Sequence, residues 1–263
     1  MQPYLLRVGS IYVHTYGVML VVAFLVTIWL TARVARQSSH LAALQATEVG
    51  EWGSLTMLMG LAGGRAWYVV QSWEAFVHQP LEIPAIWHGG LVWYGGLLGG
   101  VMGSWLFARW RGRPVLRLFD FVVPFVALGH GIGRIGCFFN GCCYGEVTRA
   151  WYGVVFPQHP DELRVPTQLF EAGALVALYV LLRLLQRPKM LNRPGRLFGI
   201  YVVTYAGIRF FLEFLRGDQT VYWGPLTIPQ VASLGGAMVG LVLVMVQWGG
   251  HGGSTPFRRS PPS

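Results

Sequence analysis

Charged residues are scarce in this sequence. They make up 12% of its 263 residues, whereas a soluble globular domain has about 25%. Acidic residues are the rarest, with 11 Asp and Glu against 20 Lys and Arg. Hydrophobic residues make up 54% of the chain, and they gather in runs of about 20 residues, the length that crosses a bilayer. Because open strands would leave backbone groups unpaired in lipid, the composition predicts an all-α integral membrane protein and not a soluble enzyme.

Seven apolar runs predict seven transmembrane helices, which lie near residues 16–35, 50–71, 90–108, 118–138, 168–186, 197–215 and 228–248. The third run is rich in glycine, as close packing of helices in a membrane requires. We expect one membrane domain at residues 1–249, with a polar outer loop near 139–167 and a disordered tail at 250–263. A cleavable signal peptide is not expected, because no small-residue cleavage site follows the long first run.

The positions of the basic residues predict the orientation of the chain in the membrane. Arginine and lysine gather after the first, third and fifth predicted spans and in the tail, and seven spans place all of these segments on one side. By the positive-inside rule, the N-terminus lies outside and the C-terminus in the cytoplasm. The formal net charge of +9 therefore reflects topology and attraction to anionic lipid head groups, and does not indicate nucleic-acid binding.

Common catalytic and metal-binding motifs are missing. The sequence contains neither H-E-x-x-H nor G-x-S-x-G, so it indicates neither a zinc protease nor a serine hydrolase. Histidines such as His130 are interpreted as polar residues at the membrane interface. The three cysteines, Cys137, Cys142 and Cys143, are spaced C-x4-C-C, which is not a common zinc pattern. A disulfide from Cys137 to one of the others and a merely space-filling role both stay open.

Three arginines, Arg65, Arg134 and Arg209, lie inside predicted spans, where ionisable residues are costly and usually functional. Glu213 follows Arg209 by four residues and shares its helix face, so a structural ion pair is one interpretation. Arg216 follows near the outer end of the same span, and Arg65 has the alternative of snorkelling outward. A guanidinium fork matches phosphate. Together these arginines favour binding of an anionic phospholipid head group at the outer interface.

Six segments resemble, in the same order, those of the prolipoprotein diacylglyceryl transferase family. They are HTYGVML, HGGLVWYGGLLGG, GHGIGRIGCFFNGCCYG, RVPTQLFEA, GIRFFLEFLRGDQ and GPLTIPQVAS. The resemblance covers the chain from about residue 10 to about residue 240. Each segment alone is a weak signal, but six in order on seven predicted spans are a strong one.

The resemblance implies an enzyme that transfers the diacylglyceryl group of phosphatidylglycerol to the thiol of a lipobox cysteine in preprolipoproteins. A thioether forms and glycerol phosphate leaves, in the first step of bacterial lipoprotein maturation. The expected partners are phosphatidylglycerol, signal peptides with a lipobox cysteine and the lipid bilayer. The expected location is the bacterial cytoplasmic (inner) membrane, with the active site towards the outer face. No cofactor and no metal are expected.

The resemblance also assigns site residues. The catalytic candidates are Arg134, Arg209, Tyr94 and Tyr16. The candidates for binding phosphatidylglycerol are Arg134, Asn140, Gly145, Glu213, Arg65 and Arg216. The leaving phosphate gains negative charge as its C–O bond breaks, and arginines in a dry cavity would stabilise that charge.

Three positions depart from the family pattern. Tyr94 stands where many members have a histidine, and a tyrosine hydroxyl is a poor base at neutral pH. Cys137 stands at a position that is normally Asn, and Cys142 at one that is often Glu. These departures leave other hypotheses open: a paralogue that uses an anionic phospholipid with a different acceptor, a thiol-redox membrane protein, and a non-catalytic lipid-binding or transport protein.

Overall fold

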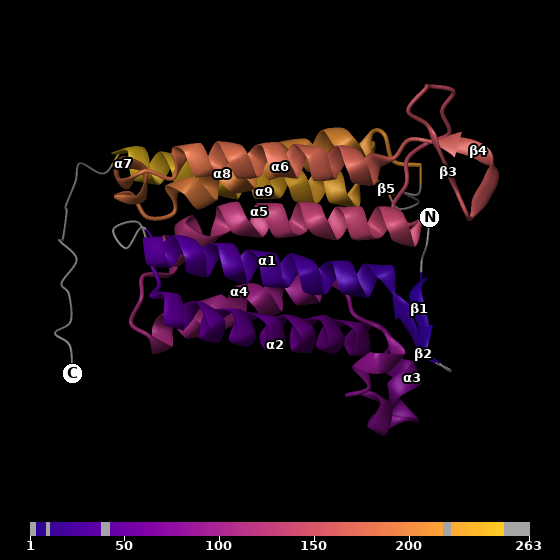
Figure 1. Cartoon of the computed structure of the whole chain (residues 1–263), viewed down its shortest axis with the longest axis horizontal. Helices are drawn as coiled ribbons and strands as arrows, with labels where there is room; N and C mark the ends of the chain where they lie inside the picture. Colours follow the sequence, from indigo (N-terminus) through magenta and orange to yellow (C-terminus); the bar gives the residue numbers. More distant parts are fainter. Residues whose placement is uncertain (1–3, 9–10, 38–42, 218–221, 250–263) are drawn as a thin grey trace. The chain divides into compact units, whose positions relative to one another are not determined.

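The structure, a computed structural model, describes residues 4–8, 11–37, 43–217 and 222–249 (Figure 1). It is mostly helical, with three short antiparallel hairpins. In chain order its elements are β1 (Tyr4–Val8), β2 (Ile11–His14), α1 (Thr15–Gln37), α2 (Ala46–Gln71), α3 (Trp73–Val77), η1 (Pro80–Glu82), η2 (Ile86–His88), α4 (Trp93–Trp110), α5 (Val115–Asn140), β3 (Val154–Phe156), β4 (His159–Arg164), α6 (Thr167–Leu185), α7 (Pro188–Leu191), α8 (Arg196–Glu213), β5 (Tyr222–Trp223), β6 (Leu226–Thr227) and α9 (Ile228–Gly249). The predicted disordered tail, 250–263, lies outside the described residues.

Four of these helices are long and apolar enough to cross a membrane. They are α1, α5, α6 and, within α9, the segment Ile228–Val246. Three others, α2, α4 and α8, have 18 residues or more, but charged residues and glycines make them less apolar. All seven predicted runs fall on these seven helices. The structure thus agrees with the prediction of a helical, multi-pass membrane protein.

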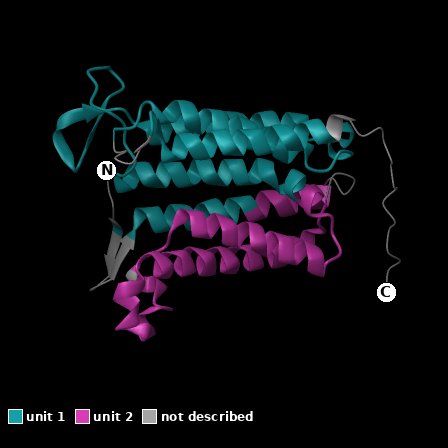
Figure 2. Ribbon diagram, turned by 180° about the vertical axis from the view of Figure 1, so that it is seen from behind, with its two compact units in different colours: residues 1–27, 119–263 teal, residues 28–118 magenta. Residues whose placement is uncertain are grey.

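The chain divides into two compact units, which Figure 2 shows in different colours. Unit 1 consists of Met1–Thr27 and Phe119–Ser263, and unit 2 of Ile28–Leu118. Unit 1 therefore contains the start of α1, nearly all of α5, and all of α6, α8 and α9. Unit 2 contains α2, α3 and α4. Each unit is described by itself below.

Unit 1 has its apolar core where α5, α6 and α8 pack together. The core consists of Val123, Ala127, Leu175, Leu178, Leu182 and Leu197. Next to it, α8 and α9 approach closely at Gly199 and Gly240: a Cβ added at either would lie 2.9 Å from the other's carbonyl oxygen. These contacts join α5, α6, α8 and α9 into one packed body.

A buried carboxylate sets the register between α5 and α8. The carboxylate of Asp120 on α5 accepts hydrogen bonds from the backbone N–H groups of Gly195 (2.6 Å) and Phe198 (2.8 Å) at the start of α8. Gly195 has a left-handed φ of 91°, which favours glycine. Both helices run away from this contact in the same direction. Arg134 lies 14 residues after Asp120, and Arg209 lies 14 residues after Gly195. At 1.5 Å per residue, each arginine is about 21 Å along its helix from this contact, so the two lie at the same height along unit 1.

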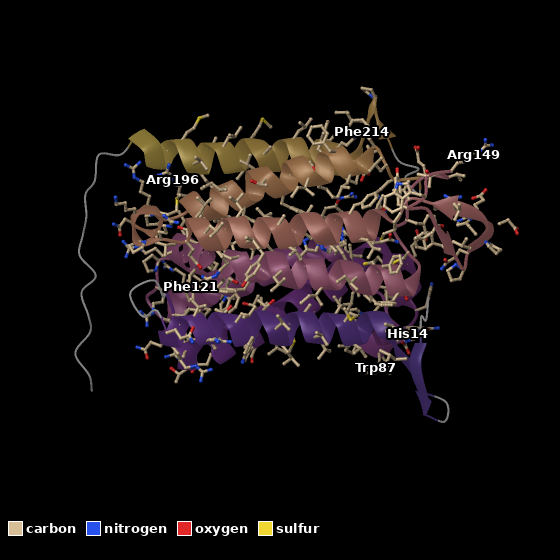
Figure 3. The ribbon with its side chains drawn as sticks, turned by 45° about the horizontal axis from the view of Figure 1, so that its top comes forward. His14, Trp87, Phe121, Arg149, Arg196 and Phe214 are labelled. Carbon is tan, nitrogen blue, oxygen red and sulfur yellow. The ribbon has the colours of Figure 1, made fainter. Side chains whose placement is uncertain are left out.

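The far end of unit 1 carries the connection that was predicted near 139–167. It runs from the end of α5 to the start of α6 and includes β3 and β4. Figure 3 shows Arg149 of this connection near Phe214, just past α8, while Arg196 and Phe121 lie towards the opposite end. The candidate site described below lies at the end marked by Arg149 and Phe214.

In unit 2, α2 and α4 pack through glycines, as the glycine-rich third run predicted. A Cβ added at Gly99 would collide with the backbone carbonyl of Met59, and one at Gly63 would collide with the carbonyl of Gly95. The indole N–H of Trp52 on α2 donates to the hydroxyl of Ser104 on α4 (3.1 Å). Small residues thus let the two backbones touch.

We predict that Gly99→Ala destabilises the protein, whereas Gly100→Ala on the same helix does not. The added methyl group at position 99 has no room, and overpacking a tight contact costs about 1–3 kcal/mol. At position 100 the nearest atom is the Cγ2 of Thr56 at 3.7 Å, and alanine is the better helix former. Thermal unfolding in detergent micelles would measure the stability of both variants. Equal shifts of their melting temperatures would contradict the close packing of α2 and α4 at Gly99.

Candidate functional site

Gly145 fixes the turn after α5 against the end of α8. Its N–H donates to the carbonyl of Val165 (2.8 Å), and it pairs with Arg216 in an isolated antiparallel bridge. A Cβ here would collide with the carbonyl oxygen of Leu215 and lie 2.8 Å from the Cβ of Val165. Only glycine allows this approach, and it brings the C-terminal ends of α5 and α8 together.

Arg134 is held by Glu171 between α5 and α6. The Arg134 Nη2 lies 3.0 Å from the Glu171 Oε1, and the Glu171 side chain is 4% exposed. The hydroxyl of Tyr205 on α8 donates to the same oxygen (3.1 Å). The Nε2 of His130 lies 3.9 Å from it, and the His130 and Tyr205 rings meet at 5.1 Å between centroids. The carboxylate of Glu171 on α6 thus contacts groups of two other helices, α5 and α8, and orients Arg134.

Arg209 is held by Glu213, one turn later on α8. The Arg209 Nη2 lies 2.7 Å from the Glu213 Oε2, and the Glu213 side chain is fully buried. The hydroxyl of Thr227, directly before α9, donates to the Glu213 Oε1 (3.0 Å). The Nε of Arg216 lies 4.0 Å from the same carboxylate. The expectation that Arg209 and Glu213 share a helix face is confirmed.

The surroundings of Arg134 and Arg209 suit an anion. The charges of both act on His130 and Tyr205, so both guanidinium groups lie near the same two side chains. The buried Nε of Arg134 and Nη1 of Arg209 have no hydrogen-bond partner within the described ranges. Buried donors without acceptors are costly, and a bound anion would satisfy them. With Arg216, three arginines face two carboxylates, which leaves one positive charge in excess.

The three cysteines converge at the end of α5 as free thiols. Their sulfur atoms all lie within 4.8 Å of one another. The backbone of Cys142 donates to the carbonyl of Cys137 (3.2 Å). The side chain of Gln168 donates to the carbonyl of Cys142 (2.6 Å), and the hydroxyl of Thr167 donates to the carbonyl of Cys143 (2.7 Å). The sequence spacing alone did not predict this convergence.

The electrostatic setting of Cys143 favours its thiolate. Hydrogen bonds from Cys137 and Cys142 lower the pKa of the Cys143 thiol, and the charges of Arg216 and Arg134 add to the effect. The cysteine cluster is therefore part of the same electropositive end of unit 1.

Tyr16 and Asn140 lie at this end as well. Tyr16, in the first turn of α1, is 37% exposed. A Cβ at Gly136 of α5 would lie 3.4 Å from the Tyr16 ring. Asn140 is the last residue of α5, and its side chain hydrogen-bonds the thiol of Cys142. Both predicted residues therefore accompany Arg134 in unit 1.

Arg65 is buried in unit 2 and anchors a loop. Its guanidinium donates to four backbone carbonyls, those of Glu82 (2.5 Å), Ile83 (2.7 Å), Gly89 (2.6 Å) and Gly90 (3.3 Å). Most of its donors are thus used within its own unit. The structure gives Arg65 a function in holding the segment between α3 and α4.

Tyr94 also belongs to unit 2. It lies in the first turn of α4, is 44% exposed, and meets the ring of Trp93 edge to face at 5.2 Å between centroids. Of the predicted site residues, unit 1 brings together Tyr16, Arg134, Asn140, Gly145, Arg209, Glu213 and Arg216. Arg65 and Tyr94 are positioned only within unit 2.

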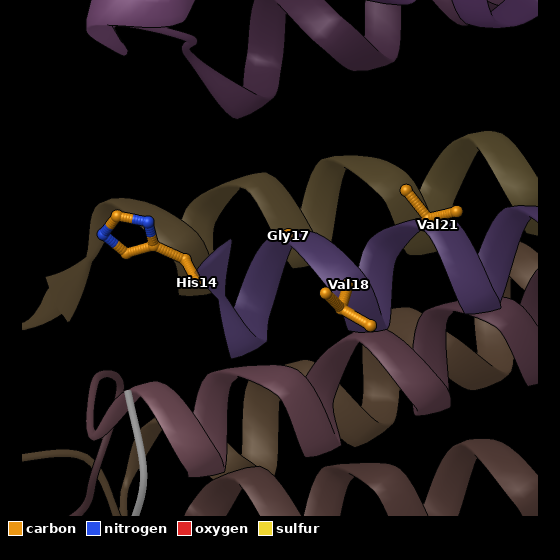
Figure 4. Close-up of a pocket in the computed structure, with 4 residues that line it drawn as sticks. All are labelled: His14, Gly17, Val18 and Val21. Atoms are coloured by element: carbon orange, nitrogen blue, oxygen red, sulfur yellow. The ribbon is translucent and has the colours of Figure 1, made fainter. Parts of the chain in front are cut away.

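An apolar pocket of about 480 Å³ lies along the first turns of α1 (Figure 4). It is lined by His14, Gly17, Val18 and Val21. Among the described residues that line it, only His14 has an ionisable side chain, and none of the four is an arginine. The chemistry that an anion requires lies instead around Arg134 and Arg209.

Sequence reasoning missed four residues that orient the arginines or lie beside them. They are Glu171, Tyr205, His130 and Thr227. Glu171 carried a usable signal, because it is an acidic residue inside the predicted span 168–186, where charge marks function. His130 was interpreted as an interface residue, but it lies next to Glu171. Tyr205 and Thr227 are ordinary residues for a span and its flank, so only the packing shows their contacts.

Comparison with known proteins identifies similar chains. A model of the family described as "Prolipoprotein diacylglyceryl transferase" matches residues 3–246. Proteins named phosphatidylglycerol–prolipoprotein diacylglyceryl transferase are similar along most of their length. The one from Cupriavidus pinatubonensis is 33% identical over 93% of this chain and 90% of its own. The one from Legionella pneumophila is 33% identical over 92% of this chain and 95% of its own. The one from Oleidesulfovibrio alaskensis is 34% identical over 92% of this chain and 92% of its own.

We predict that Arg65→Gln lowers the stability of the fold by at least about 3 kcal/mol, because it removes several hydrogen bonds from a charged, buried donor. The loop between α3 and α4 should become sensitive to protease. Thermal unfolding and limited proteolysis in micelles would measure these effects, with the exposed Arg109→Gln of the same unit as the control. An Arg65→Gln protein as stable as this control would contradict the anchoring function.

Proposed function

Because the chain belongs to the prolipoprotein diacylglyceryl transferase family, we propose that it transfers the diacylglyceryl group of phosphatidylglycerol to a cysteine thiol of prolipoproteins. One observation in the structure carries this proposal. Arg134 and Arg209 are partly buried near each other, each is oriented by a single carboxylate, and each keeps a buried nitrogen without a partner among the described residues. These features support our proposal that the two arginines bind the phosphate of the phospholipid.

The proposed reaction is a displacement at carbon. The thiolate sulfur of the lipobox cysteine attacks the terminal CH₂ group of the diacylglyceryl moiety, and a C–S bond forms. The bond between that carbon and the phosphate oxygen breaks, its electron pair stays on the oxygen, and glycerol phosphate leaves. The thiol proton leaves before or during the attack, because the thiolate is the nucleophile. The step requires no oxidant and no metal.

Arg134 and Arg209 act on the leaving group. The phosphate carries one negative charge as a diester and gains a second as the C–O bond breaks. Fixed guanidinium groups in a site that excludes water stabilise this developing charge, and they need no reorganisation when the reaction occurs. Removing one such donor typically lowers the rate about 100- to 1,000-fold.

The neighbouring residues position the arginines and the lipid head group. Glu171 and Glu213 hold Arg134 and Arg209 by ion pairs of 3.0 and 2.7 Å. Their carboxylates keep the guanidinium groups pointing in one direction without a bound ligand. Arg216 adds positive charge at the same end. We propose the side chain of Asn140 as a hydrogen-bond partner for the glycerol hydroxyls of the head group.

Tyr16 and Tyr94 stay proposed catalytic residues on different grounds. The support for Tyr16 is its place beside α5, within reach of the charge of Arg134. The support for Tyr94 is its position in the glycine-rich segment that resembles the family's third span. Gly145 contributes by letting the end of α5 meet the end of α8, and Arg65 by holding its loop.

We propose seven membrane spans, with the N-terminus and the site at the outer face of the bacterial cytoplasmic membrane. The support is the coincidence of seven apolar runs with seven long helices. In unit 1, the segment between α6 and α8 holds Arg187, Lys189 and Arg193. It lies at the end opposite the cysteines, and basic loops face the cytoplasm. The site then opens where a lipobox signal peptide emerges from the membrane.

The activity itself is tested with purified protein in micelles that contain phosphatidylglycerol and a lipobox peptide. Mass spectrometry should detect the diacylglyceryl adduct on the peptide cysteine. We predict that Arg134→Lys and Arg209→Lys each slow its formation at least about 100-fold, because lysine keeps the charge but loses the planar fork.

Arg149→Gln is the matched control, since Arg149 is an exposed arginine at the same end of unit 1. This variant should retain full activity. Thermal unfolding of each variant shows whether it is folded. Adduct formation that is unchanged in folded Arg134→Lys and Arg209→Lys would contradict the proposed phosphate site, and a wild-type protein that forms no adduct would contradict the proposed activity.

A further inference from the structure

The cluster of three thiols has no part in the proposed transfer reaction. We propose that Cys137, Cys142 and Cys143 together bind one soft, thiophilic cation of the Cu(I) class through their three sulfur atoms. This inference concerns the cluster alone and does not depend on the transfer activity.

The sulfur atoms are already close to the spacing that such a site needs. All three lie within 4.8 Å of one another. A metal about 2.3 Å from each sulfur, the usual length of a bond between zinc and sulfur, places sulfur atoms about 4 Å apart in a trigonal arrangement. Rotation of the side chains covers the difference, so the backbone does not need to move.

The backbone that carries the thiols is fixed by buried side chains. Gln168 and Thr167, which are 1% and 3% exposed, hold the carbonyls of Cys142 and Cys143. Cys143 has a left-handed φ of 64°, a conformation that non-glycine residues rarely adopt and that persists only where its surroundings impose it. The turn is therefore built so that the two adjacent cysteines face Cys137 at the end of α5.

The number and kind of ligands favour a soft monovalent cation. Within the described residues, the group contains three cysteines and no histidine, aspartate or glutamate. Thiolates suit both Cu(I) and zinc, but zinc in structural sites takes four ligands, so a group of three thiols favours Cu(I). Three thiolates and one Cu(I) ion carry a charge of −2. The charges of Arg134 and Arg216 act on Cys143, and the one positive charge by which the arginines of this end exceed its two carboxylates offsets part of it.

Metal binding releases the protons of the thiols. Cys137 is 9% exposed and Cys142 and Cys143 are half-buried, so a metal ion can enter from the outer end. A disulfide between two of the cysteines would compete with metal binding.

The test is a Cu(I) titration of the full-length protein in detergent micelles, without oxygen and with a phosphine reductant. A chromogenic Cu(I) chelator serves as competitor, and elemental analysis after desalting gives the stoichiometry. We expect one tightly bound Cu(I) per chain, with a sulfur-to-copper charge-transfer band in the ultraviolet. The variant with all three cysteines replaced by serine should lose it, and each single Cys→Ser variant should bind at least about 100-fold more weakly.

The chain also has 7 His and 8 Met, which can bind Cu(I) as well. The variant with all three cysteines replaced by serine measures this other binding, so that it can be subtracted. His159→Gln, which removes an imidazole of β4 at the same end of unit 1, should bind Cu(I) as the wild type does. Thermal unfolding shows that the serine variants are folded, and Cys142→Ser alone is the fallback if the triple variant is not. Equal Cu(I) binding by wild-type and triple-serine proteins would overturn the proposal. So would reduced wild-type protein that binds no Cu(I), or that binds only Zn(II) in its place.

Discussion

The need to pair every buried charge governs the structure of unit 1. An ionised side chain in an apolar interior costs several kcal/mol unless a partner and further hydrogen bonds accompany it. Arg134 and Arg209 meet this condition with one carboxylate each, Glu171 and Glu213. Each carboxylate in turn takes a hydroxyl from another element, a tyrosine of α8 or the threonine before α9. Satisfying two guanidinium groups therefore also ties α5, α6, α8 and α9 together at one end.

The opposite end decides whether the two arginines can meet at all. Asp120 holds the first turn of α8 by two backbone hydrogen bonds, and this fixes how α5 and α8 are aligned. Because both helices rise equally from that contact, residues at equal sequence distance from it lie at equal height. Gly145 then closes the other end, where its missing side chain admits the backbone of α8. A buried acid at one end and a glycine at the other thus set the geometry of the arginine site between them.

The sequence predicted the long helices well, because only helices and closed barrels can span a membrane, and continuous apolar runs of about 20 residues have the length of a spanning helix. It also indicated Arg134 and Arg209 as candidates, because an arginine inside an apolar run is costly, and the structure pairs each with a buried carboxylate. Glu171 is also an ionisable residue inside an apolar run, but its contacts with α5 and α8 depend on the packing of three helices, which the pattern of one run does not contain. The loop-holding function of Arg65 depends on four backbone carbonyls, whose positions no side-chain pattern reveals. The convergence of the thiols likewise depends on a left-handed residue, Cys143.

The ratio of arginine to carboxylate at this end suits both the stability of unit 1 and the proposed binding of a phosphodiester. If each guanidinium were matched by more than one acid, no donor would remain for a ligand. If no acid were present, three uncompensated charges would repel one another in an apolar interior. Two acids against Arg134, Arg209 and Arg216 leave one positive charge in excess, and the Nε of Arg134 and the Nη1 of Arg209 have no hydrogen-bond partner among the described residues. That excess matches the single charge of a phosphodiester, and the free donors can strengthen their bonds as the second charge develops on the leaving phosphate.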